Sequence, residues 1–208
     1  TILLTAKELQ KNNINNNKIS KDLDLLVNQS NRCSAILKKL SLSPNLNDEF
    51  IDLNYKISDY LNEIVRSFQE ISKKKFIINY ENNINPITTK KSAEIIYGLR
   101  NFIGNANKFS KNKIEIILNS GNENTEVIIK DDGPGFPKDL IYKHKLGEPY
   151  IRTTDESYIS KHGLGLGTFI GKTLLEKNFA DINFNNLNEN SGAIVTIKWK
   201  NIDLKNKI

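Results

Sequence analysis

The sequence of 208 residues contains no methionine, one cysteine, one tryptophan and two histidines. A single cysteine excludes a disulfide within the chain and is typical of a reducing compartment. No run of 18 apolar residues occurs, so the sequence predicts no membrane-spanning helix among these residues. Because even position 1 is not methionine, we expect the chain to be a piece of a larger protein, whose upstream part could contain a membrane segment.

Positive charge is in excess but is not concentrated. The formal net charge is +6 and the isoelectric point is near 9.2, values that permit binding to nucleic acid or to an acidic surface. Apart from SKKK at 72–75, however, the lysines are scattered along the chain. Since no dense basic block is interleaved with aromatic residues, we expect no nucleic-acid partner.

The first 42 residues have the pattern of a helical hairpin. Residues 1–11 resemble the end of a helix, and residues 12–18 are polar and turn-prone. From Leu23 to Leu40, apolar or small residues recur at alternating spacings of three and four, a heptad seam that includes Cys33. Two such helices cannot bury both apolar faces alone, so residues 1–42 are predicted to dimerise into a four-helix bundle. The Ser-, Pro- and Asn-containing segment at 43–49 is predicted to be a linker.

Residues 50–202 alternate between strand and helix patterns, which predicts an α+β fold with a mixed or antiparallel sheet in a two-layer α/β sandwich. A C-terminal tail at 203–208 follows. The expected helices cover 55–71, about 90–109 and the segment after the glycines at 163–167. The expected strands cover 50–53, 75–80, 113–118, 125–130, 180–186 and 193–200, and a long polar loop is expected at about 137–162.

The expected helix over 90–109 carries Asn101 and Asn105 one turn apart, on one face. Asparagine is a mediocre helix former because its side chain competes for backbone hydrogen bonds. The whole chain is rich in asparagine, so compositional bias is the simplest alternative explanation for the pair. Asn107 points away from this face, and we expect it to face solvent.

Three segments, taken in this order, resemble the nucleotide-binding motifs of one protein family. NFIGNANKFS at 101–110 is similar to the N box of sensor histidine kinases, DDGPGF at 131–136 to the G1 box, and GLGLG at 163–167 to the G2 box. The resemblance covers about residues 50–200 and extends to gyrase-, Hsp90- and MutL-type ATPases. It implies a Bergerat-type fold that binds ATP and Mg²⁺.

A closer resemblance, to redox-responsive RegB/PrrB-type kinases, extends over almost the whole chain. It rests on NRCSAILKKLS, EPYIRT and GLGLGTFIGKTLLEK. It implies the cytoplasmic catalytic part of a two-component sensor histidine kinase whose parent protein is anchored in the bacterial inner membrane. Such a kinase transfers the γ-phosphoryl group of ATP to a histidine and then to an aspartate of a response regulator.

The chemistry of the G1 and N boxes agrees with this resemblance. An ionised aspartate only accepts hydrogen bonds, so Asp131 could accept the exocyclic amine of adenine and would repel the carbonyl of guanine. Gly133 and Gly135 let the backbone approach the base and the ribose. Mg²⁺ prefers oxygen ligands, and the amide oxygen of Asn105 could supply one without adding negative charge near the triphosphate.

The remaining candidates would contact phosphate or the base. Lys108 offers a point charge to phosphate oxygens, and glycines before a helix can present bare amides to an anion. Thr196, in a closing strand, could assist adenine, although strand propensity explains a threonine equally well. The predicted nucleotide-binding residues are Asn101, Asn105, Lys108, Phe109, Asp131, Gly133, Gly135, Gly163, Gly165, Gly167 and Thr196, with Asn105 as the metal ligand.

No histidine precedes His144, although the resemblance implies an acceptor histidine on the first helix of the hairpin. We therefore expect the acceptor directly upstream of Thr1, so that these residues alone contain no phosphorylation site. A kinase-dead dimerisation scaffold is one alternative. An ATP-driven clamp of the gyrase or Hsp90 type is another, but it needs a glutamate base in the N-box helix, and Glu94 lies seven residues before Asn101.

Two interpretations of Cys33 are open, a packing role and a redox role. It lies on the heptad seam, and most free cysteines in such positions are small buried apolar residues. In a two-fold dimer the seam also approaches the partner chain, and Arg32 could favour the thiolate. The RegB/PrrB resemblance implies a redox-active cysteine in this segment.

Overall fold

The computed structural model describes residues 55–82, 86–149, 166–188 and 191–205, together with Leu23 and Val27. The chain divides into two compact units, residues 1–49 and 50–208. Of the first unit, only Leu23 and Val27 are described, and both are helical. The expected bundle, the linker, Cys33 and the strand at 50–53 lie outside the described residues. Among the described residues, no helix is both long and apolar enough to cross a membrane.

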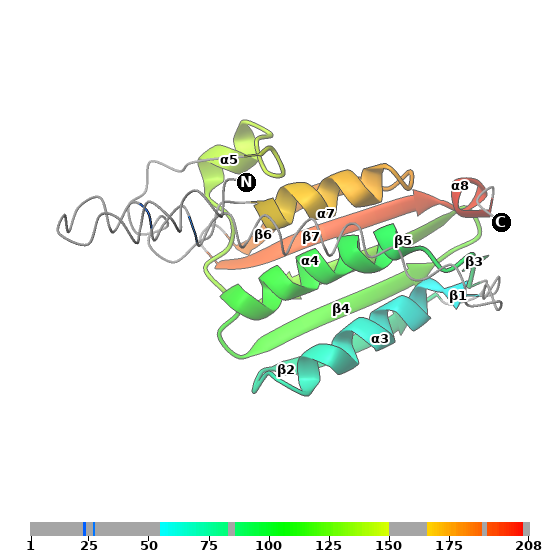
Figure 1. Ribbon diagram of the computed structural model, residues 1–208, viewed down its shortest axis with the longest axis horizontal. Coiled ribbons are helices and arrows are strands. Elements are labelled where there is room, and N and C mark those ends of the chain that lie inside the picture. Colours follow the sequence, from blue (N-terminus) through cyan, green and yellow to red (C-terminus); the bar gives the residue numbers. More distant parts are fainter. Residues whose placement is uncertain are drawn as a thin grey trace. The chain divides into compact units, whose positions relative to one another are not determined.

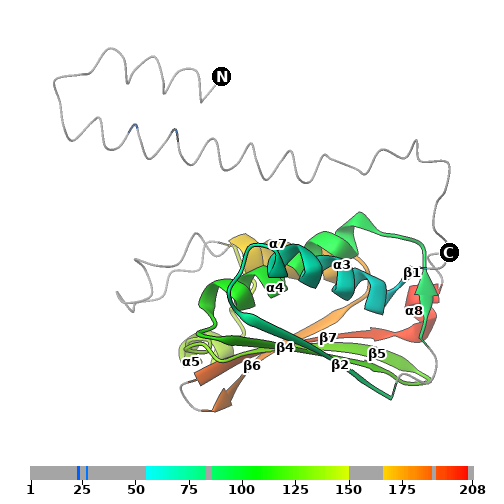
Figure 2. The same ribbon diagram turned by 90° about the horizontal axis from the view of Figure 1, so that it is seen from below.

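Five strands form one mixed sheet in the spatial order β2-β4-β5-β7-β6. Strands β2 and β4 are parallel, and the other three pairs are antiparallel. Helices lie over one face of this sheet, as Figure 2 shows from the side, which confirms the predicted two-layer α+β sandwich. The strands in Figure 1 are β2 (Lys75–Glu81), β4 (Lys113–Ser120), β5 (Asn124–Asp131), β6 (Asp181–Asn188) and β7 (Ser191–Lys200), and the helices are α3 (Ile57–Gln69), α4 (Ala93–Phe109) and α7 (Leu166–Glu176).

The two central strands follow the alternation expected of a sheet with one buried face. Along β5 every second residue is buried, and the buried set ends at Asp131. Ile116 of β4 pairs with Ile129 of β5, and both lie beneath the helices with at most 1% of their surface exposed. Because neighbouring side chains point to opposite faces of a strand, Asp131 lies on the helix-covered face.

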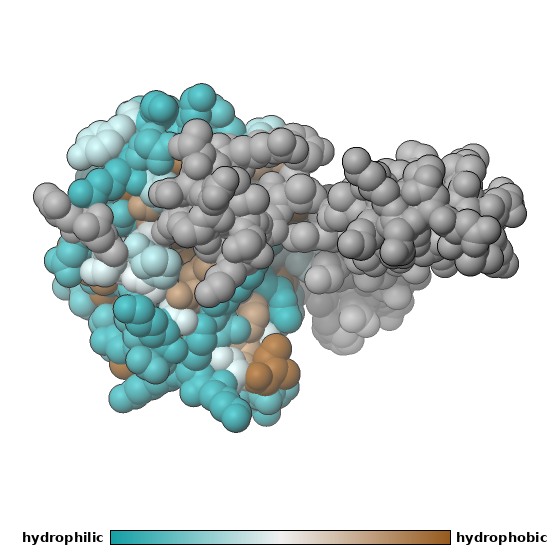
Figure 3. All heavy atoms as spheres, turned by 90° about the vertical axis from the view of Figure 1, so that its left-hand side faces the viewer, coloured by the Kyte–Doolittle hydropathy of each residue, from teal (hydrophilic) through white to brown (hydrophobic). Residues whose placement is uncertain are grey.

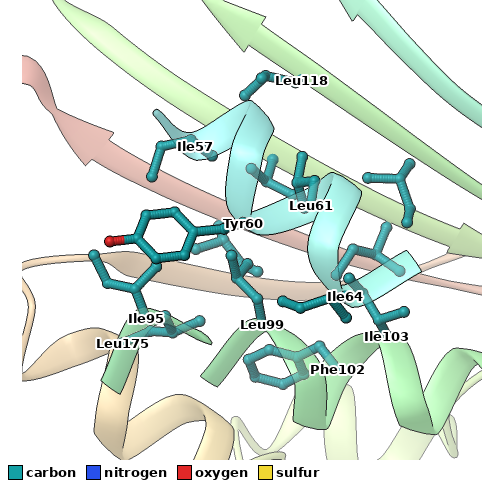
Figure 4. Packing of buried hydrophobic residues seen from close by; sticks show 14 of the residues in the cluster. Ile57, Tyr60, Leu61, Ile64, Ile95, Leu99, Phe102, Ile103, Leu118 and Leu175 are labelled. Atoms are coloured by element: carbon teal, nitrogen blue, oxygen red, sulfur yellow. The ribbon is translucent and has the colours of Figure 1, made fainter. Parts of the chain in front are cut away.

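Helices α3 and α4 place their apolar faces on the sheet. Four α3 side chains (Ile57, Tyr60, Leu61 and Ile64) meet Ile95, Leu99, Phe102 and Ile103 of α4 in the core drawn in Figure 4. Helix α4 begins after Ser92, whose hydroxyl accepts the backbone N–H of Ile95 at 3.4 Å as an N-cap. The cap and the apolar spacing together explain why an asparagine-rich segment is helical.

Helices α4 and α7 approach each other closely through two glycines. A Cβ atom added at Gly98 of α4 would lie 2.5 Å from Cγ of Leu175. A Cβ atom added at Gly171 of α7 would lie 3.2 Å from the ring of Phe102 and from Cβ of Asn101. Glycine permits such backbone approach because it carries no side chain.

Several short elements were not predicted. Strand β1 (Tyr55–Lys56) pairs with β3 (Thr88–Thr89) beside the main sheet. The loop predicted at 137–162 contains a short helix, α5 (Lys138–Tyr142), so that prediction was wrong for these residues. Elements of two to five residues are too short to show a hydrophobic period.

The packed domain continues beyond residue 202. Helix α8 (Asn201–Lys205) crosses the predicted start of the tail, and Leu204 belongs to the hydrophobic core. The side chain of buried Asn201 donates to the carbonyl oxygens of Gly121 (2.8 Å) and Asn122 (2.9 Å) and accepts from the hydroxyl of Thr125 (2.8 Å). These bonds tie α8 to the turn between β4 and β5.

Two substitutions in α8 test whether this helix is part of the folded domain. Leu204 is 2% exposed and Ile202 is 64% exposed. Leu204→Ala should lower the free energy of unfolding by about 2–4 kcal/mol, because it removes buried methyl groups and leaves a cavity. Ile202→Ala on the same helix should change it by less than about 0.5 kcal/mol. Urea unfolding measures both; equal effects would show that α8 does not pack as described.

Candidate nucleotide-binding site

Asp131 ends β5 as a buried carboxylate, 7% exposed. Its Oδ1 accepts the backbone N–H groups of Gly133 at 2.8 Å and Ala193 at 3.3 Å. Burial raises the pKa of Asp131 above its ordinary value, although these two hydrogen bonds oppose the shift. The side chain is therefore an oriented acceptor in a poorly solvated place, which suits recognition of a single N–H donor.

The loop after Asp131 is called here the adenine loop (residues 131–136), after the contact predicted for it. It is packed too tightly for side chains at its glycines. A Cβ atom at Gly133 would lie 2.6 Å from the carbonyl oxygen of Phe109. Gly135 has φ +81°, and a Cβ there would lie 2.7 Å from Oδ1 of Asn186. The sequence assigned both glycines to contacts with ligand, but their immediate neighbours here are protein atoms.

Two residues that sequence reasoning missed support this loop. The Asn186 side chain in β6 accepts the N–H of Phe136 at 2.7 Å and donates to its carbonyl oxygen at 2.9 Å. Ala193 in β7 donates its backbone N–H to Asp131. Neither could be recognised in advance, because asparagine is common throughout this chain and a backbone donor leaves no mark in the sequence.

Asn101 and Asn105 face the first turn of α7. The Asn105 side chain donates to the hydroxyl of Thr168 at 3.2 Å, and the Asn101 side chain donates to the carbonyl oxygen of Tyr97 at 2.8 Å. A Cβ atom at Gly167 would lie 3.5 Å from Oδ1 of Asn105 and 3.6 Å from Oδ1 of Asn101. Two amide oxygens thus converge on Gly167, the position in the first turn of α7 that carries no side chain.

This arrangement fits a magnesium–phosphate group. Mg²⁺ commonly takes one or two ligands from the protein and the rest from phosphates and water. Among the described residues, no group of three or more His, Cys, Asp or Glu side chains is placed so that it could hold a metal ion. The amide oxygens of Asn101 and Asn105 are candidates for such a ligand, and the sequence predicted that of Asn105.

The C-terminal turn of α4 is occupied by local contacts. Lys108 is exposed, and its Nζ lies 5.0 Å from the centroid of the Phe109 ring. Asn107, which was predicted to face solvent, instead accepts a hydrogen bond from the hydroxyl of Ser72 at 2.7 Å. That prediction was wrong because the partner comes from a segment 35 positions earlier in the chain.

Thr196 lies away from the other candidates. It is paired with Ile128 of β5 and Asn183 of β6, and its buried neighbours Val195 and Ile197 point to the helices. By strand alternation Thr196 points to the opposite face of the sheet from Asp131. We therefore leave it out of the adenine site.

The glycine-rich cradle is described only in part. Gly167 lies in the first turn of α7, whereas Gly163 and Gly165 lie outside the described residues. The described candidates form two groups. Asp131, Gly133 and Gly135 surround the end of β5, Asn101 and Asn105 meet Gly167, and the C-terminal half of α4 joins the groups.

Comparison with known proteins gives the family of the α+β domain. The family described as histidine kinase-, DNA gyrase B- and HSP90-like ATPase matches residues 91–202. The sensor histidine kinase RegB of Cereibacter sphaeroides is 28% identical over 218 aligned residues, which cover 96% of this chain and 46% of RegB. The chain thus spans about half the length of the RegB relatives that it matches.

Solved structures share the fold. The Acinetobacter baumannii histidine kinase AdeS has a TM-score of 0.58 and 19% identity, covering 96% of this chain and 93% of that one. Full-length ShkA in complex with AMPPNP has a TM-score of 0.60 and 17% identity, covering 95% of this chain and 42% of ShkA. With the family match spanning more than half of its residues, the chain belongs to the histidine kinase-, DNA gyrase B- and HSP90-like ATPase family.

Proposed function

We propose that residues 50–205 bind ATP with Mg²⁺ and that the protein containing this chain is a two-component sensor histidine kinase. It would transfer the γ-phosphoryl group to a histidine outside the given sequence and then to an aspartate of a response regulator. The observation that carries the proposal is the buried Asp131 acceptor, joined through α4 to the Asn105 amide at the first turn of α7. Similarity to RegB over 96% of the chain supports the kinase assignment.

Each group has a distinct task in this proposal. The Asp131 carboxylate accepts the exocyclic amine of adenine, while Gly133 and Ala193 hold that carboxylate in place through their N–H groups. Asn105 would hold Mg²⁺, which neutralises charge on the phosphates when bound. Phosphoryl transfer depends mainly on positioning and charge stabilisation, and this division of tasks provides both.

A hydrolytic clamp is less well supported than a kinase. Hydrolysis requires a base that activates water near the γ-phosphate. Glu94 is the one carboxylate residue in α4, and it lies about 16 Å along the helix from Asn105 at about 1.5 Å per residue. Its carboxylate instead accepts the hydroxyl of the N-cap Ser92 at 2.8 Å.

The wider assembly follows from the same proposal. We propose a homodimer formed through residues 1–42, a response regulator as the protein partner, and a cytoplasmic position below a membrane anchor supplied by another part of the protein. The redox role of Cys33 stays a prediction, and a non-reducing gel of gently oxidised protein beside Cys33→Ala would test it.

Asp131→Asn tests adenine recognition. The asparagine oxygen can still accept the N–H groups of Gly133 and Ala193, so the fold should persist, while the carboxylate acceptor for the adenine amine is lost. We expect ADP and ATP affinity to fall by roughly 10- to 100-fold, the effect of one hydrogen bond to a charged group. Calorimetric titration measures it; affinity unchanged from wild type would remove Asp131 from the site.

Asp131→Asn should also increase the free energy of unfolding, by an amount that depends on pH. The pKa of Asp131 is raised by burial, so the folded state binds this proton more tightly than the unfolded state. The contribution of Asp131 to the wild-type free energy of unfolding is therefore greatest at low pH. It is lost as the pH rises from the unfolded pKa of about 3.9 through the raised pKa of the folded state. The free energy of unfolding of Asp131→Asn relative to wild type should be larger at pH 7 than at pH 4. A constant difference across this range would contradict the assigned burial effect.

Asn105→Asp tests the metal and phosphate contacts. A new negative charge beside the phosphates should weaken ATP binding about tenfold or more in the presence of Mg²⁺. Asn107→Asp is the matched control, since its amide oxygen bonds Ser72 and a carboxylate can accept the same hydrogen. Titrations with Mg²⁺ and with EDTA would compare both variants. Failure of the unaltered chain to bind ATP in the presence of Mg²⁺ would refute the proposed function.

A further inference from the structure

The adenine loop contains a second carboxylate, Asp132, which binds a different part of the chain from Asp131. Asp132 accepts the backbone N–H groups of Lys111 at 2.7 Å, Asn112 at 3.0 and 3.1 Å, and Lys113 at 3.2 Å. Burial raises the pKa of Asp132, but the three N–H donors together hold it below its ordinary value. Three backbone donors on one side chain form a specific junction rather than a chance surface contact.

These donors belong to the turn that leaves α4. Residues 111–113 follow directly after Phe109 and Ser110, which end the helix that carries Asn105. The junction lies at the end of the domain where β4 begins and β5 ends (Figure 1). Figure 3 looks onto this end, and the described surface there is mainly hydrophilic. The junction itself consists of hydrogen bonds from backbone N–H groups to the Asp132 carboxylate.

Two further contacts fix the same end of α4. Lys74 donates through Nζ to the carbonyl oxygens of Asn107 and Ser110, where a cation is favoured at a helix C-terminus. Gly133 packs so closely on the carbonyl oxygen of Phe109 that no side chain fits between them. The turn is thus bound on its carbonyl oxygens by the Lys74 ammonium group and on its N–H groups by the Asp132 carboxylate.

We propose that Asp132 is a positioning residue for the nucleotide, which fixes the adenine loop to the end of α4 and so sets the spacing between Asp131 and Asn105. Asn105 and Asp131 are 26 positions apart along the chain, with the whole β4–β5 hairpin between them. Through Asp132 the connection is much shorter: one peptide unit, a set of hydrogen bonds and the last turn of α4. The inference rests on the proposed function, because it assumes that one ligand contacts both residues.

Three variants test it with ADP and Mg²⁺ by calorimetry at a temperature where each is fully folded. Asp132→Ala removes the acceptor and should weaken ADP binding at least about tenfold. Asp132→Asn retains one acceptor oxygen and should stay within about threefold of wild type. Leu204→Ala is the control: it destabilises the domain through α8, far along β7 from Ala193, and should leave ADP affinity unchanged.

The outcomes separate this inference from the proposed function. If the wild-type chain binds ADP and folded Asp132→Ala binds it equally well, Asp132 serves stability alone and the inference is wrong. If Leu204→Ala weakens binding as much as Asp132→Ala does, the effect is general destabilisation and the inference is also wrong. Absence of binding by the wild-type chain would refute the proposed function itself.

Hydrogen exchange provides a second test should Asp132→Ala fail to fold. In the wild-type chain, ADP should slow exchange of the amides of Lys111, Asn112 and Lys113, although these residues are not proposed to touch the ligand. The turn amide of Gly121, which donates to the carbonyl oxygen of Asn124 at 3.0 Å, is the control and should change much less. No selective slowing at 111–113 would overturn the proposal.

Discussion

Gly98 of α4 and Leu175 of α7 are in contact at a spacing that would not accommodate a side chain at position 98. Gly171 of α7 is the second glycine of this interface, and the ring of Phe102 packs against its backbone in the same way. Because the two helices approach so closely, the asparagines of α4 reach the first turn of α7 directly. The candidate phosphate end of the site therefore depends on packing between two helices that belong to distant parts of the sequence.

The other end of the candidate site depends on how the buried carboxylate of Asp131 is stabilised. A carboxylate buried at the end of β5 costs stability, since the aqueous alternative solvates its charge better. Two backbone N–H groups, from Gly133 and Ala193, offset part of that cost and also fix the direction of the acceptor. The domain thus keeps an oriented acceptor at the end of β5, where the proposed function places the adenine amine.

Sequence reasoning identified the elements that have long, regular patterns. Strands β4 and β5 were recognisable from alternating isoleucines, and α4 from its apolar spacing. The Asn105 and Asp131 candidates came from motif order and from the chemistry of their side chains. In the structure, Asp131 lies on the helix-covered face of the sheet, and Asn105 lies on α4 against the first turn of α7.

The asparagines whose roles were missed have one thing in common. Their hydrogen-bond partners lie far away in the sequence, so no local pattern shows them. Asn107 is bonded to Ser72, and Asn186 to the adenine loop 50 positions earlier. Asn201 satisfies three groups around the β4–β5 turn. In a chain with so many asparagines, these structural amides look the same as solvent-exposed ones. The role predicted for Thr196 finds no support in its position, on the opposite face of the sheet from Asp131.

The order of strands also bears on how this chain emerges from a ribosome. β7 is the last of the described strands to be synthesised, yet it lies between β5 and β6, and within the described sheet β6 pairs with β7 alone. Until about residue 200 has been made, the long edge of β5 carries unpaired backbone donors and acceptors. Such an edge can pair with other chains, and domains generally fold as units only once their sequence is complete. Nascent chains of this domain should therefore pass through a stage in which chaperone binding competes with aggregation at the exposed edge of β5.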